Sequence, residues 1–142
     1  SILGGGGWGF VAASDGGAGS DAGDGTGAGG AFVATPNTAS GYAAVVCGGG
    51  LGEASGIRTV VAAGFGNRAT GDAASVWSGE ENHAEAELSS VSGGAFNTAA
   101  GRSSVIVSGR LNRTEGTESA VLGGRQNVAS GGASTVSGGS SN

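Results

Sequence analysis

A 15-residue repeat runs through most of this chain, and it restricts the possible folds more than any other feature of the sequence. Two glycine columns recur at this spacing, beginning at Gly41 and Gly49, together with an asparagine column and an aliphatic column. The aliphatic column consists of Val46, Val61, Val76, Val91, Ile106, Val121 and Val136. The consensus unit reads S-x-V-x-G-G-x-x-N-x-A-x-G-x-x and is clearest in residues 89–103. Such a short repeat is typical of a solenoid, in which each unit packs only against its neighbours.

Each unit holds two short runs of alternating residues separated by glycines, which is typical of two brief strands joined by turns. Successive side chains of a strand point to opposite faces, so the aliphatic column shares one face and is expected to point inward. An alanine column that includes Ala99 and Ala129 is expected to meet it across a thin core. We expect the glycines to supply turn conformations with positive φ. The sequence therefore predicts an all-β fold, a β-solenoid or flattened β-roll of 15-residue coils over residues 27–142.

The first 26 residues fit the repeat poorly, and residues 1–26 are predicted to form an irregular, glycine-rich cap or atypical coils. Phe10 and Val11 are a candidate inward strand there. The same segment matches a calcium-binding nonapeptide once, with Asp15, Asp21 and Asp24 as weak candidate ligands. Because such a site needs consecutive matching turns and the following residues do not continue the pattern, we expect no metal and no cofactor.

The asparagine column has two interpretations, a structural ladder or a row of ligand-binding side chains. Amides stacked just inside a turn can bond to neighbouring coils and satisfy backbone groups that the core buries. We favour this ladder, whose members are Asn67, Asn82, Asn97, Asn112 and Asn127.

The outward side chains differ between the two strands of the unit. Beside the alanine column they are polar, whereas beside the aliphatic column they are mostly apolar and include Phe32, Trp77, Val107 and Leu122. One valine and one alanine per coil make a small core against the entropy of ordering the whole coil. Since a large apolar strip usually marks an interface, we expect several rolls to associate side by side through it. The alternative is that these apolar side chains are scattered and exposed.

Charge and chemistry argue against several functions. The chain has no Lys, six positive charges against eleven acidic residues and a net charge of −5, which does not suit a nucleic-acid-binding face. The only histidine, His83, has no evident catalytic or ligand partner, and the only cysteine, Cys47, falls in the outward apolar column. The acidic pair Glu80–Glu81 is expected to be solvated charge. We therefore expect no enzyme, and no apolar run approaches the roughly 20 residues of a membrane span.

Two stretches carry a family resemblance. Residues 90–94 (SVSGG) followed by residues 97–101 (NTAAG), and the similar stretch over residues 119–131, resemble the head repeat of trimeric autotransporter adhesins. The likeness covers about residues 27–142. It implies a left-handed β-roll in each of three chains, forming a head at the tip of an outer-membrane fibre that binds host matrix or other surfaces. The double glycine and the 15-residue period differ slightly from the commoner form of that repeat, and no ligand-binding residue is implied.

We therefore expect a non-enzymatic, extracellular homo-oligomer, with three chains as the implied number, that attaches to a surface. The surface ligand is unknown and could be a matrix protein, a glycan or a cell surface. One alternative is a phage tail-fibre segment or a purely structural spacer. Another is an ice-binding β-roll, which is less favoured because charges interrupt the outward Thr and Ser positions.

Overall fold

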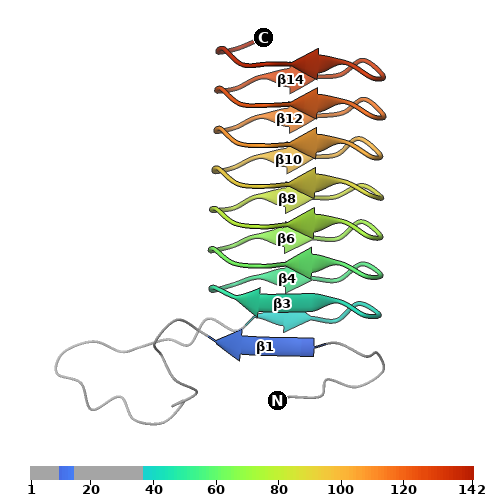
Figure 1. Ribbon diagram of the computed structural model, residues 1–142, viewed down its shortest axis with the longest axis vertical. Helices are drawn as coiled ribbons and strands as arrows, with labels where there is room; N and C mark the ends of the chain where they lie inside the picture. The colour runs from blue at the N-terminus through green and yellow to red at the C-terminus, as the bar shows by residue number, and fades with distance from the viewer. Residues whose placement is uncertain (1–9, 15–36) are drawn as a thin grey trace, which may run out of the picture.

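The computed structural model describes residues 10–14 and 37–142, which form two parallel sheets and contain no helix (Figure 1). The odd-numbered strands make an eight-stranded sheet, here called sheet A. They are β1 (Phe10–Ser14), β3 (Val45–Gly48), β5 (Val60–Val61), β7 (Ser75–Val76), β9 (Ser90–Val91), β11 (Val105–Ile106), β13 (Ala120–Val121) and β15 (Thr135–Val136).

The even-numbered strands make a seven-stranded sheet, here called sheet B. They are β2 (Thr38–Ala39), β4 (Glu53–Ala54), β6 (Arg68–Ala69), β8 (His83–Ala84), β10 (Thr98–Ala99), β12 (Arg113–Thr114) and β14 (Val128–Ala129). The chain alternates between the sheets, so that each coil stacks on the one before it (Figure 1). The predicted β-solenoid, with two short strands per coil, is confirmed.

The register of both sheets follows the repeat. Val91 pairs with Val76, and Ala99 pairs with Ala84, so each residue lies beside its counterpart in the preceding repeat. A third, narrower parallel ladder runs along the turns that follow β3 and the later odd-numbered strands. It consists of single bridges that join Gly50, Phe65, Glu80, Ala95, Arg110, Arg125 and Ser140 in that order. This ladder was not predicted from the sequence.

The N-terminal strand departs from the repeat. β1 pairs with β3, so the strand expected at Phe10 and Val11 is present, although its register shifts between Val11 and Ser14. Phe10 pairs with Val45 rather than with a residue one repeat further along. Phe32, the calcium candidates Asp15, Asp21 and Asp24, and the expected boundary between residues 26 and 27 all lie outside the described residues.

The core is the thin layer between the two sheets. The aliphatic column is fully buried from Val46 to Val121, and Val136 in the last coil is partly buried against it. The alanine column faces it as expected, and Thr114 takes the place of alanine in one coil. The Thr114 hydroxyl lies 2.7 Å from that of Ser104, so this buried polar pair is satisfied inside the core.

The turns correct one expectation about glycine. The column that begins at Gly49 does adopt positive φ, with 88° at Gly94. The column that begins at Gly41 does not, and glycine is required there for a different reason. A Cβ at Gly101 would overlap the carbonyl oxygen of Gly116 in the next coil, so this column allows successive coils to approach closely.

Left-handed backbone also occurs where no glycine predicts it. Two further positions in most coils have positive φ with an ordinary side chain, for example Leu88 at 58° and Phe96 at 57°. The Leu88 N–H donates to the Asp72 carbonyl at 2.9 Å, and the Phe96 N–H donates to the Glu80 carbonyl at 2.9 Å. These bonds to the preceding coil hold each turn in a conformation that costs an L-residue roughly 1–2 kcal/mol.

Candidate interaction surfaces

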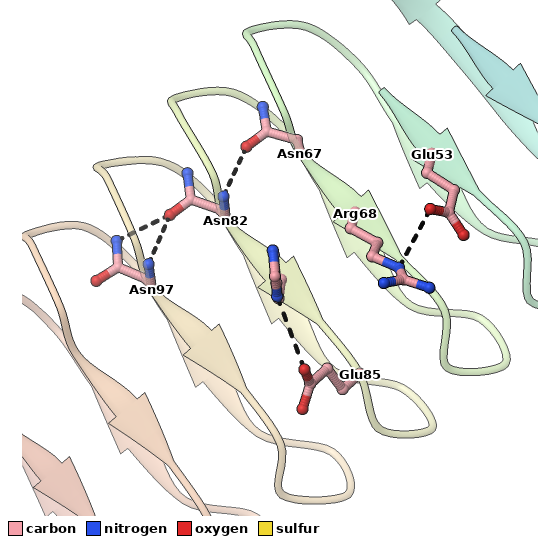
Figure 2. A network of polar contacts seen from close by, with 7 residues as sticks. Glu53, Asn67, Arg68, Asn82, Glu85 and Asn97 are labelled. Atoms are coloured by element: carbon pink, nitrogen blue, oxygen red, sulfur yellow. Dashed lines mark hydrogen bonds and ion pairs between the residues drawn. The ribbon is translucent and has the colours of Figure 1, made fainter. Parts of the chain in front are cut away.

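The asparagine side chains form a continuous ladder along one turn of the solenoid. Figure 2 shows Asn67, Asn82 and Asn97 on successive coils, each stacked over the next. The Oδ1 atom of each accepts a hydrogen bond from the backbone N–H of the next asparagine, at 3.0 Å from Asn82 to Asn67 and 3.1 Å from Asn97 to Asn82. The ladder continues through Asn112 and Asn127 to Asn142.

The ladder uses both ends of each amide. The Nδ2 of Asn97 donates to the Gly93 carbonyl at 3.1 Å and to the Gly109 carbonyl at 2.9 Å, and the side chain is fully buried. It therefore has no face toward solvent from which to bind a ligand, and its bonds are those that the structural interpretation describes. Between Asn37 and Asn142 the ladder is altered where glycine replaces asparagine, at Gly52, whose N–H still donates to Asn37 Oδ1 at 2.8 Å.

The outer face of sheet A is free of charge from β3 to β15. Its outward positions hold Val, Ala, Ser, Thr, Cys, Trp and Leu. Of the predicted interface residues, Trp77 is 55% exposed, Val107 42% and Leu122 46%. Serines such as Ser75 and Ser90 interrupt the apolar surface, and the hydroxyls of these two bond to each other at 3.1 Å. The face is thus an uncharged, partly apolar strip that runs the length of the stack.

The outer face of sheet B is charged, and its charges are paired within the chain. Glu53 pairs with Arg68 at 3.3 Å in the adjacent coil, and Arg113 pairs with Glu115 at 2.7 Å (Figure 2 shows the first pair). These side chains are about half exposed, so each pair stabilises the fold by no more than roughly 1 kcal/mol. This polar face was expected from the sequence, and it lies on the side of the rod opposite the uncharged face of sheet A.

The residues with chemical reactivity lie apart from one another. His83 Nδ1 lies 3.7 Å from Glu85 Oε1 on sheet B, and the two form an ion pair only when the imidazole is protonated. Cys47 is exposed on sheet A, as expected. Within residues 10–14 and 37–142, no group of three or more His, Cys, Asp or Glu side chains is arranged to hold a metal ion.

A third surface, along one row of turns, was not predicted from the sequence. The turns after the odd-numbered strands, on the left of the stack in Figure 1, carry two adjacent residues per coil, and most of their side chains are exposed. One belongs to the bridge column described above, and the other is the residue that follows it. We call these two columns the turn edge: the bridge column Gly50, Phe65, Glu80, Ala95, Arg110, Arg125 and Ser140, and the adjoining column Leu51, Gly66, Glu81, Phe96, Leu111, Gln126 and Ser141. Aligning the repeats by coil would have shown it, but the residue types differ so much that no column stands out.

The part of the chain that the structure describes holds no helix with the length and apolar character needed to cross a membrane. Comparisons with protein families, with characterised proteins and with solved structures found no match to this chain.

Proposed function

We propose that this chain is a non-enzymatic segment of an extracellular fibre, which assembles as a homotrimer through the outer face of sheet A and attaches to a surface. The observation that supports the proposal is the contrast between the two sheets. One face of a regular rod is free of charge along its length, while the other carries paired charges. A protein that functioned as a single rod would have no need to keep one face uncharged and apolar, since such strips usually mark contact surfaces.

The choice of three chains rests on the resemblance of the repeat to trimeric adhesin heads. The stack itself supports a role in which shape and repetition matter more than a single site. The ladder hydrogen bonds and the ion pairs of sheet B join groups of the same chain, so they stabilise the rod and do not form a ligand-binding site. A purely structural spacer in a fibre uses the same features.

Assembly is tested by substituting one outward residue on each sheet. Trp77→Glu places a charge on the sheet A face, where Trp77 is more than half exposed, and is expected to reduce the assembly to monomers. Thr98→Glu makes the matching change on sheet B and is expected to leave assembly unchanged. The measurement is solution mass by light scattering after size exclusion, with circular dichroism to show that both variants fold. Identical masses for both variants and the wild type would refute the assignment of the two faces.

Attachment is tested separately, by binding of fluorescently labelled wild-type protein to arrays of matrix proteins and glycans. If binding comes from several weak contacts per assembly, the Trp77→Glu monomer should bind more weakly by a factor of roughly 10². Equal binding by monomer and assembly would locate the ligand site within one chain. Absence of binding to any surface, with assembly intact, would favour the spacer. A folded wild-type monomer would remove the sheet A argument, and inhibition of ice growth would then be measured.

A further inference from the structure

The turn edge combines exposed apolar side chains with charges. Phe65 is 46% exposed and Phe96 and Leu111 are each 41% exposed, although all three lie on tight turns. Phe96 and Leu111 also hold left-handed backbone, with φ of 57° at both. A turn under these constraints would favour glycine or asparagine for its own stability. Gly66 occupies the same column as Phe96 and Leu111 with a φ of 66°, so the turn itself does not require a large apolar side chain, and these two remain exposed.

The charges on this edge lack partners within the described chain. Three ion pairs within the described residues join Glu53 to Arg68, Glu87 to Arg102 and Glu115 to Arg113, and Glu85 forms a fourth with His83 when that imidazole is protonated. The charged side chains of the turn edge, Glu80, Glu81, Arg110 and Arg125, take part in none of them. The Arg110 guanidinium instead lies over the Phe96 ring, 5.7 Å from its centroid, and remains exposed.

The order of residues along the bridge column is complementary to its own reverse. Take the coil that carries Ala95 and Phe96 as the centre. One coil below it lie Glu80 and Glu81, and one coil above it lies Arg110. Two coils above the centre lies Arg125, and two coils below lies Phe65. The carboxylate of Glu81 leans away from the centre, because a Cβ on Gly66 in the next lower coil would lie 2.5 Å from its Oε1.

We propose that the turn edge binds the turn edge of a second copy of this chain, with the two rods antiparallel. A two-fold axis through the Ala95–Phe96 coil, perpendicular to the rods, places every coil of one copy opposite its counterpart in reverse order. Glu80 then faces Arg110 twice in the dimer, and the two Phe96 rings face each other on the axis. Phe65 faces Arg125, an arrangement that allows a cation–π contact.

The opposite orientation is electrostatically unfavourable. If the two rods ran parallel, each coil would face the same coil of the partner, and Glu80 and Glu81 of both copies would meet at one level. Four carboxylates would then lie together without a cation, whereas Arg110 and Arg125 would face Leu111 and Gln126. Like charges held opposite one another across an interface disfavour the contact. The charge pattern therefore selects the antiparallel pair.

The contact is small and is suited to connecting assemblies rather than to building one. Seven coils at about 4.8 Å each give an edge roughly 30 Å long, and a strip about 10 Å wide falls well below the roughly 800 Å² per partner of a standard interface. Pairing of single rods is thus weak, and it strengthens when rods are held together in a larger assembly. The turn edge is distinct from the sheet A face, so this inference does not depend on the proposed trimer.

A charge-reversal pair tests the proposal. Variant one carries Glu80→Arg and Glu81→Arg, which makes the edge positive, and variant two carries Arg110→Glu and Arg125→Glu, which makes it negative. Each protein is measured by sedimentation equilibrium at low salt and at protein concentrations up to about 1 mM. The wild type is expected to reach twice the mass of the species that it forms at low concentration. Either variant alone is expected to raise the dissociation constant of this pairing roughly tenfold or more. Mixing the two variants should restore pairing. Undiminished self-association of either variant, or folded variants that fail to pair when mixed, would overturn the proposal.

Cysteine cross-linking tests the orientation. In a Cys47→Ser background, Leu51→Cys and Ser141→Cys lie on the same column, six coils apart, or about 29 Å. Antiparallel pairing brings Leu51 of one copy opposite Ser141 of the other, so a mixture of the two single-cysteine proteins should form a mixed disulfide dimer. Parallel pairing would instead cross-link each protein to itself, and that result would overturn the proposal. Trp77→Glu reports on sheet A alone, so failure of the proposed trimer and failure of edge pairing are distinguishable.

Discussion

Replacing Asn97 with alanine should remove a large part of the stability of this solenoid. The amide of Asn97 accepts a bond from the Asn112 N–H at 3.0 Å and donates to Gly93, Gly109 and Asn82 Oδ1 at 2.9–3.1 Å. The buried Asn112 N–H loses its acceptor, which costs about 1–3 kcal/mol, and the other bonds contribute about 0.5–1.5 kcal/mol each. We expect a loss of about 3–5 kcal/mol, out of a total that is typically about 5–15 kcal/mol for a folded domain.

The assay is denaturant unfolding followed by circular dichroism, with amide hydrogen exchange to locate the damage. The Asn112 N–H should exchange faster in the variant than in the wild type, because its acceptor is gone. Gln126→Ala is the matched control, since it removes an exposed amide next to the ladder and should change stability by less than about 0.5 kcal/mol. A cost at Asn97 below about 1 kcal/mol, or equal to that at Gln126, would show that the ladder does not hold the coils together.

Two further substitutions test the core and the coil contacts. Ser104→Ala should lower the free energy of unfolding by about 1–3 kcal/mol, because it leaves the buried Thr114 hydroxyl without a partner. Thr114→Ala, alone or combined with Ser104→Ala, should lower it by less than about 1 kcal/mol. Additive losses in this double-mutant cycle would contradict the pairing. Thr114→Ala is the milder change because the Ser104 hydroxyl can turn to the carbonyl three residues before it, as the Ser119 hydroxyl does. Gly101→Ala should abolish folding or destabilise the solenoid severely, since its Cβ would overlap the Gly116 carbonyl. The control Gly138→Ala has nothing within 4 Å of the added carbon and should leave the melting temperature almost unchanged. Equal melting temperatures for the two glycine variants would refute the close-approach argument.

The sequence was sufficient for the parts of the fold in which one residue type meets one physical requirement. Val91 and its counterparts are enclosed by neighbouring coils, and Asn97 must satisfy backbone groups on both sides, so few residues fit and the period is visible. The polar face of sheet B followed from the alternation of side chains along each strand.

Features in which the backbone is held by neighbouring coils could not be predicted in this way. Phe96 adopts a left-handed conformation because its N–H bonds to the coil below, and local propensity argues against it. Gly101 was expected to serve a turn conformation, although its role is to let the coils approach, which depends on a carbonyl in the next coil. The partnership of Ser104 and Thr114 spans the core between residues ten positions apart, a separation that no strand or turn pattern indicates.

The turn edge was not predicted because its residue types differ from coil to coil. The sequence pattern indicated that Glu80 and Glu81 are solvated charges. It did not connect them with Arg110, which lies two coils from Glu80. The bridges between successive coils show that these residues share one edge. The outer face of sheet A is the intermediate case, since alternation predicted its direction and placed Ser90 on it, but not the hydrogen bond between Ser75 and Ser90.

The direction of the hydrogen bonds between coils has a mechanical consequence. Those bonds join each strand to its counterpart in the next coil, so they run along the axis of the rod (Figure 1). A pull on the two ends would load them a coil at a time, opening the stack from an end while the remaining coils keep their contacts. Each released coil extends by roughly 45 Å beyond its folded height. Under tension, such a rod would lengthen in equal steps and dissipate work at each of them, which would limit the force that reaches its two ends.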